Sequence, residues 1–119
     1  MEKIIIYQVF TRLFGNKNTT CMENGSLAEN GTGKFSDFDA KVLKRIKSLG
    51  ANYIWYTGVI RHATCTDYSA YHIPRQHPAV VKGKAGSPYA ICDYYDVDPD
   101  LADDVDRRME EWESLIARS

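Results

Sequence analysis

The sequence has no long apolar run, few cysteines and almost no net charge, and each absence excludes a class of protein. No stretch approaches the roughly 18 apolar residues of a membrane span. The start MEKIIIYQVF lacks the length and the cleavage site of a signal peptide. Cys21, Cys65 and Cys92 are odd in number and irregularly spaced, which predicts no disulfide framework and favours a reducing compartment. We therefore expect a cytoplasmic protein, with secretion as the alternative if a leader was removed before residue 1. A net charge of −1 predicts neither a nucleic-acid nor a membrane partner.

Length and composition are those of one globular domain. The 119 residues are 44% hydrophobic and 26% charged, so disorder is not expected. Charge is nevertheless uneven, because ten of the 16 acidic residues lie between Asp93 and Glu113. Four basic residues gather at 41–47. We interpret both groups as solvated helix faces.

The first half of the chain predicts a β–α–β unit. Residues 3–10 are apolar at nearly every position, as in a strand buried on both faces of a parallel sheet, and a Gly- and Asn-rich loop follows. Residues 35–51 predict a helix with Ser36 as its N-cap, Asp39 as the capping carboxylate and Gly50 as its stop. Residues 51–59 predict a second buried strand, parallel to the first.

The second half predicts a long irregular segment, 60–99, and then an amphipathic helix. Leu101, Val105, Met109, Trp112 and Ile116 recur at helical spacing. No third strand follows this helix, and two parallel strands alone make a poor sheet. We therefore expect the pair to belong to a larger sheet.

The segment SPYAICDYYDVDP, 87–99, concentrates tyrosines and carboxylates without a clear period. One interpretation is a turn-rich loop. The other is a surface that holds a polar ligand with a flat, C–H-rich face, because an aromatic ring offers such a face a matching apolar plane. Asp98 before Pro99 predicts a helix N-cap, and Asp93 is expected to accept backbone N–H groups.

Four segments together resemble one enzyme family. IIIYQVFTRLFGN resembles the first barrel strand of the α-amylase family of retaining glycoside hydrolases, and FSDFDAKVLKRIKSLGANYIWYTGV resembles its first helix and second strand. SPYAICDYYDVDPDLA resembles a tyrosine-containing loop of the family, and RRMEEWESLIARS its second helix. The likeness is greatest to bacterial α-amylases of the Bacteroides type.

The resemblance implies that residues 1–119 are the first quarter of a (β/α)8 barrel, an α/β fold with two parallel strands, two helices and long loops. The parent would hydrolyse α-1,4-glucosidic bonds in starch-like glucans by a retaining mechanism. Tyr89 matches the tyrosine that stacks on the sugar at the bond to be cleaved, although Ala90 stands where many members have aspartate. The family's catalytic carboxylates lie on later strands, so this chain alone is expected to be inactive.

Metal sites are not predicted. His62, Cys65, His72, His77 and Cys92 offer zinc-ligand types without paired-ligand spacing. Some relatives hold calcium at the loop that corresponds to NKNTT and ENGSLAENGTG, but few carboxylates are present there, and a plain loop is expected.

A second hypothesis is a stand-alone carbohydrate-binding or self-assembling module derived from such a barrel. That module would cover its open strands by forming a homo-oligomer. In both hypotheses the expected partner is an α-glucan oligosaccharide or polysaccharide.

Overall fold

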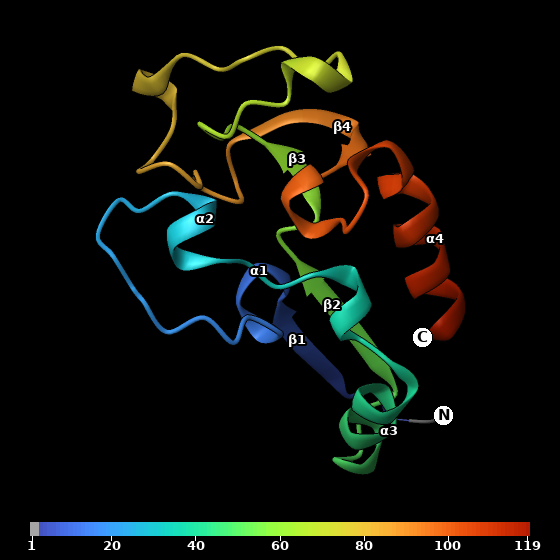
Figure 1. Cartoon of the computed structure of the whole chain (residues 1–119). Helices are drawn as coiled ribbons and strands as arrows, with labels where there is room; N and C mark the ends of the chain where they lie inside the picture. The colour runs from blue at the N-terminus through green and yellow to red at the C-terminus, as the bar shows by residue number, and fades with distance from the viewer. Residues whose placement is uncertain (1–2) are drawn as a thin grey trace.

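The centre of the fold is a pair of parallel strands. The computed structural model describes residues 3–119. Strand β1 (Ile6–Phe10) pairs with β2 (Tyr53–Thr57) in a register that runs from Ile6 opposite Tyr53 to Phe10 opposite Thr57. Helix α3 (Ala40–Ser48) lies between them in sequence and sits at the N-terminal end of the strands (Figure 1). The predicted parallel β–α–β unit is therefore confirmed, and the chain is a mixed α/β fold.

Only one face of this sheet is covered. Its inner face packs on a core that includes Phe35, Phe38 and Leu115, and Leu115 comes from helix α4 (Arg108–Arg118). On the outer face Ile6 and Trp55 remain 59% and 55% exposed. The expectation that both strands are buried on both faces is wrong for the described residues, because none of the described elements covers that side. The inner-face residues of the two strands are Tyr7, Val9, Ile54 and Tyr56.

Helix α3 begins later than the sequence predicts. Its N-cap is Asp39, whose Oδ1 accepts the Val42 N–H at 2.9 Å, whereas Ser36 lies in a separate 3-10 turn, η1 (Phe35–Asp37). The two segments separate because Phe35 and Phe38 are both fully buried and anchor the turn in the core. Gly50 ends the helix as expected, with a φ of +94° and its N–H bonded to the Lys47 carbonyl.

A second, two-stranded sheet forms within the segment that we predicted to be irregular. Strand β3 (Ile60–His62) pairs antiparallel with β4 (Ile91–Val97), with register shifts between successive pairs. The prediction of an irregular segment is wrong at these strands and holds for the chain between them, apart from two 3-10 turns, η2 (Ser69–Tyr71) and η3 (Pro78–Val80). In Figure 1 this intervening chain passes above the second sheet and then descends on its left before it enters β4.

The helix expected from Leu101 begins only at Arg108. Leu101 belongs to the 3-10 turn η4 (Pro99–Leu101), and a further turn, η5 (Val105–Arg107), precedes α4. Leu101 is fully buried and Ala102 is extended, so the chain cannot continue as one helix. The remaining helices, α1 (Thr11–Phe14) and α2 (Leu27–Asn30), are single turns.

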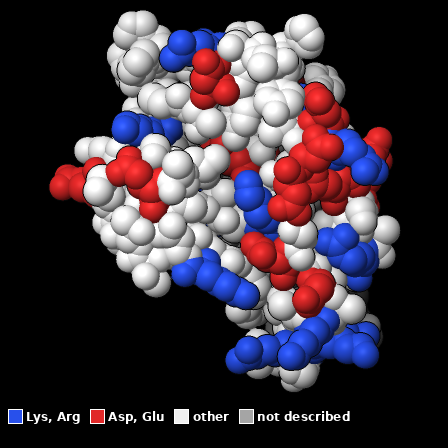
Figure 2. All heavy atoms as spheres, viewed as in Figure 1, with Lys and Arg blue, Asp and Glu red and all other residues white. Residues whose placement is uncertain are grey.

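Charge is distributed as two separate surfaces. The basic residues of α3 are exposed at one end of the molecule, and acidic residues gather along η5 and α4 (Figure 2). The expectation of solvated faces holds for these groups, but Asp98 and Asp100 are buried.

Between residues 3 and 119, none of the helices has both the length and the apolar character needed to cross a lipid bilayer.

Candidate functional site: a groove at the carboxyl end of β1

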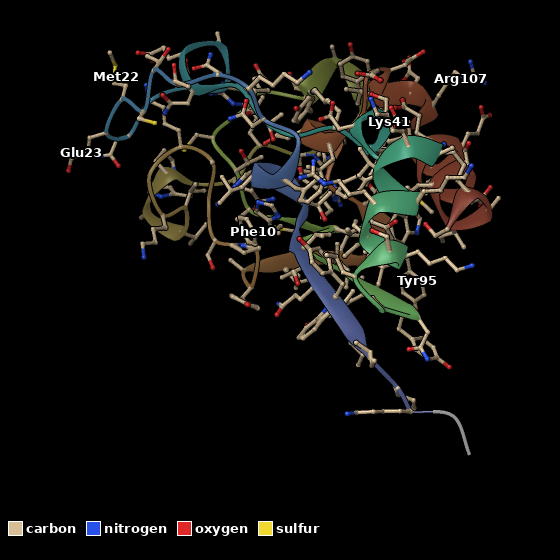
Figure 3. All side chains as sticks on the ribbon, turned by 90° about the horizontal axis from the view of Figure 1, so that it is seen from below. Phe10, Met22, Glu23, Lys41, Tyr95 and Arg107 are labelled. Atoms are coloured by element: carbon tan, nitrogen blue, oxygen red, sulfur yellow. The ribbon has the colours of Figure 1, made fainter. Side chains whose placement is uncertain are left out.

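An open groove of about 610 Å³ lies at the carboxyl end of β1. Phe10 and Arg12 line it on the strand side, and the loop Lys82–Gly86 and Tyr89 line it on the other side. The Arg12 guanidinium lies 5.2 Å from the centroid of the Phe10 ring, within range of a cation–π contact. Figure 3 shows Phe10 at the end of β1, with Met22 and Glu23 at the outer tip of the α1–α2 loop.

Tyr89 is 78% exposed. Its position follows from a turn, because the Ala90 N–H bonds to the Ser87 carbonyl and the Tyr89 N–H bonds to the Ser87 hydroxyl oxygen. The adjacent Pro88 packs beside Gly58, just beyond the end of β2. The structure thus presents the Tyr89 ring to solvent at the groove.

The loop Lys82–Gly86 is held in place through its carbonyl groups. Arg12 Nη1 donates to the Gly86 carbonyl at 2.9 Å, and His62 Nε2 lies 3.1 Å from the Ala85 carbonyl. The Lys84 carbonyl accepts from the Cys65 N–H and the Thr64 hydroxyl. The sequence predicted none of these contacts, although Arg12 lies two residues beyond the end of a predicted strand, where binding residues of parallel sheets often lie.

The groove offers aromatic, amide and cationic groups but no carboxylate. Beside Tyr89 and Phe10 its lining contains Asn24, Asn30 and three cationic side chains, and no Asp or Glu. Retaining glycoside hydrolysis needs two carboxyl groups about 5 Å apart. The groove lining thus presents an aromatic face and hydrogen-bonding groups without the pair of carboxyl groups that such hydrolysis uses. The three cations are Arg12, Lys82 and Lys84.

A buried polar cluster lies behind this groove. Asp98 is fully buried and is an N-cap, since its Oδ1 accepts the Asp100 N–H at 3.1 Å, although it caps the 3-10 turn η4 and not the predicted helix. Tyr68 donates its hydroxyl to Asp100 Oδ1, and Lys34 Nζ donates to the Asp100 carbonyl at 2.7 Å. Sequence reasoning considered His62 only as a residue of zinc-ligand type. It missed the burial that places Nδ1 3.6 Å from Asp98 Oδ2, because no local pattern marks that burial.

Burial dominates the protonation of this cluster. It raises the pKa of Asp98 to about 8, with the Asp100 carboxylate acting in the same direction and Arg12 and Lys34 against it. Burial lowers the pKa of His62, against the backbone carbonyls of Ala85 and Ile60. The pKa of Tyr68 is raised by burial and by Asp100. All three groups thus favour their neutral forms.

Asp93 and the loop asparagines have structural partners. Asp93 Oδ1 accepts the Tyr95 N–H at 2.9 Å, as predicted, and its Oδ2 pairs with Arg61. In the loop before η1, the carboxamide oxygens of Asn16, Asn18 and Asn30 each accept a backbone N–H. These oxygens hold the loop together, so they do not form an open cage for calcium.

The candidate zinc ligands do not meet. Among residues 3–119 no group of three or more His, Cys, Asp or Glu side chains is arranged to hold a metal ion. The three cysteines are free, and His62 is buried against Asp98. His77 caps the 3-10 turn η3 by accepting the Ala79 N–H at Nδ1.

Comparison of the chain with family models, with curated proteins and with solved structures found no match.

Proposed function

We propose that the chain supplies the first two β/α units of an α-amylase-type (β/α)8 barrel and that its groove binds an α-1,4-glucan, with Tyr89 as the platform for one sugar ring. The observation that carries the proposal is the exposed Tyr89 ring beside Phe10 and Arg12 at the carboxyl end of a parallel strand pair. Ligands of (β/α)8 barrels bind at that end of the strands.

The uncovered face of the β1–β2 sheet supports the barrel part of the proposal. Strands that line a closed barrel carry apolar side chains on their inner side. Ile6, Tyr53 and Trp55 occupy this face, and Phe10 continues it to the groove. The opposite face packs against helices, as the outer face of a barrel strand does.

The chemistry of the groove supports a neutral sugar ligand for binding rather than for cleavage. A pyranose ring presents C–H bonds that match the face of Tyr89, and its hydroxyl groups match the amide and cationic donors around it. The groove lining holds no carboxylate, so this chain's part in the reaction is to bind and orient a sugar. The two reacting carboxyl groups of the proposed enzyme would come from other strands of the barrel.

Titration of the ¹⁵N-labelled chain with maltoheptaose tests the proposal. We expect amide shifts at Ser87–Ala90 and at Lys82–Gly86. Tyr89→Ala should weaken binding by about two- to tenfold, the value of one aromatic stacking contact, while Tyr89→Phe retains most of the affinity. Tyr95→Ala is the control, because Tyr95 is 94% exposed and lies outside the groove lining. Equal affinity of Tyr89→Ala and the unaltered chain would remove Tyr89 from the site.

A second candidate function, self-assembly, is favoured by the same uncovered sheet face. Ile6, Tyr53 and Trp55 are each more than half exposed on adjacent strands. Contiguous apolar surface of this kind usually marks an interaction site. A second copy of the chain would cover it and would protect the strand edges.

A further inference from the structure

His62 contacts the groove loop through one ring nitrogen and faces a buried carboxyl group with the other. A carbonyl oxygen only accepts hydrogen bonds, so the 3.1 Å contact with the Ala85 carbonyl requires the hydrogen on Nε2. Nδ1 then carries a lone pair in the neutral ring. It has no hydrogen-bond partner and lies 3.6 Å from Asp98 Oδ2, which is likewise unpartnered.

Two lone pairs facing each other in a buried site require a proton between them. Both side chains are almost completely buried, at 1% and 0% exposure, and a separation of 3.6 Å is too short for a water molecule to stand between Nδ1 and Oδ2. The proton belongs to a neutral Asp98 that points its O–H at Nδ1, because burial raises the pKa of Asp98 and lowers that of His62. The other groups that act on the pair are Asp100, Tyr68, Arg12 and Lys34.

Loss of this proton changes which ring nitrogen carries hydrogen. Below the transition the pair holds two protons, one on Asp98 and one on Nε2. When one proton leaves to solvent, the carboxylate attracts the remaining proton to Nδ1, since N–H···carboxylate bonds are stronger than neutral ones. Nε2 is then an acceptor facing the Ala85 carbonyl, and the hydrogen bond between them is lost.

We propose that His62 is a positioning residue for the groove and that the proton it shares with Asp98 controls its hold on the loop Lys82–Gly86. In the protonated pair, Nε2–H fixes Ala85 and with it the groove side opposite Phe10. In the deprotonated pair this hydrogen bond is lost, and the Ala85 carbonyl keeps only the long contact from Arg12 Nη1 at 3.5 Å. The neighbouring carbonyls of Gly86 and Lys84 keep their contacts to Arg12, Thr64 and Cys65. The ligand of the groove rests on the proposed function, but the tautomer switch does not.

The switch is measured directly by ¹⁵N NMR of the His62 ring and of the Ala85 and Gly86 amides, from about pH 6 to about pH 10. We expect the Nε2–H tautomer at neutral pH and the Nδ1–H tautomer above a transition near pH 8, with the two amides shifting at the same midpoint. An Nδ1–H tautomer throughout the range, or amides that do not follow the ring, would overturn the proposal.

Two variants isolate the shared proton. Asp98→Asn retains an acceptor for the Asp100 N–H and offers a permanent donor to Nδ1, and His62→Gln retains a donor for Ala85 without a titrating ring. Both should abolish the transition, whereas Asp103→Asn, in an exposed position of the same segment, should leave it unchanged. Persistence of the amide transition in either of the first two variants contradicts the proposal. Far-UV circular dichroism establishes that the variants are folded.

Maltoheptaose affinity separates this inference from the proposed function. Loss of one neutral hydrogen bond predicts about a two- to tenfold weaker affinity above the transition, and no such loss in Asp98→Asn. If the chain binds no maltoheptaose at any pH while the NMR transition occurs, the proposed ligand is wrong and the switch stands. If the sugar binds and the transition is absent, the switch alone is wrong.

Discussion

Arg108 binds the carboxylate of Asp96 with two hydrogen bonds, from Nε at 2.8 Å and from Nη2 at 3.0 Å. Both side chains are mostly buried, and Arg61 approaches the same carboxylate at 3.4 Å. The first residue of α4 is thereby joined to β4, and β4 to β3. This bidentate pair fixes α4, which closes the core, against the β3–β4 sheet. The buried Asp98 and His62 lie beside this contact.

Replacement of Arg108 by methionine should destabilise the chain, because it removes both close guanidinium contacts and leaves the mostly buried Asp96 carboxylate with only the Val97 N–H at 2.8 Å and the longer contact to Arg61. We expect the free energy of unfolding to fall by about 1–3 kcal/mol, measured by urea denaturation. Arg107→Met is the matched control. Its ion pair with Glu110 is exposed, so no measurable change is expected. Equal effects of the two substitutions would show that the bidentate geometry contributes nothing.

Gly86 is required by the path of the groove loop. Its φ is +79°, and an added Cβ would overlap the Ala63 carbonyl oxygen. Gly50 also has a positive φ, +94°, but has open space around it. Gly50→Ala should cost about 1 kcal/mol from backbone strain, and Gly86→Ala roughly 2–4 kcal/mol together with displacement of the loop. Thermal unfolding of both variants measures the difference, and similar losses would argue against the close packing of Gly86 on Ala63.

The parallel strand pair was predictable because local signals and the global fold agree there. Apolar runs mark β1 and β2, and Gly50 marks the end of the helix between them. Strand β4 was not predictable, because its polar and apolar positions do not alternate in the usual way. Asp93 and Asp96 are turned toward Arg61, and an inward carboxylate paired with a distant arginine leaves no trace in a local hydrophobic pattern.

The candidate site, too, was predictable where local sequence determines it and not where long-range contacts do. The capping role of Asp98 follows from the local Asp-Pro sequence and was predicted, but the capped element is the 3-10 turn η4 and not a helix. The burial of His62 depends on β3–β4 pairing and on the return of the chain at Ala85, which are long-range contacts. Tyr89 was singled out by resemblance. Its exposure is consistent with that role, and its role in binding stays a prediction.

The buried Asp98 predicts that the chain loses stability as pH rises. Its pKa is near 8 when folded and has an ordinary value of 3.8, so the folded state binds more protons between these values. The contribution of the neutral Asp98 carboxyl to stability is complete below about pH 4 and is lost as the pH rises to about 8. Over this range the free energy of unfolding falls by no more than about 1.4 kcal/mol per pH unit. His62 acts oppositely, since its lowered pKa makes its contribution fall as pH drops below 6.5.

Asp98→Asn should remove the loss on the alkaline side. Its amide keeps the cap to the Asp100 N–H and does not ionise, so the free energy of unfolding should exceed that of the unaltered chain most clearly above about pH 8. Urea denaturation at a series of pH values measures this, with Asp103→Asn as the reference. A parallel pH dependence for Asp98→Asn and the unaltered chain would falsify the assignment of a neutral buried Asp98.

Trp55 provides the test of what covers the open sheet face. It lies opposite Gln8 in the strand register and is 55% exposed, so Trp55→Thr removes apolar area without disturbing the core. If a second copy covers this face, sedimentation velocity should show a concentration-dependent oligomer that Trp55→Thr weakens and that Tyr95→Thr, on the other sheet, leaves intact. If the face lines a barrel whose other strands are supplied by further chain, the isolated 119 residues should instead gain a defined partner when those strands are added. Trp55→Thr should then weaken that association, because the substituted side chain would lie in the barrel interior, where about 25 cal/mol is lost for each Å² of apolar area left uncovered. Two results together would show that the exposed face is neither a contact between copies nor part of a barrel interior. The isolated chain would stay monomeric at high concentration, and Trp55→Thr would associate with the added strands as well as the unaltered chain does.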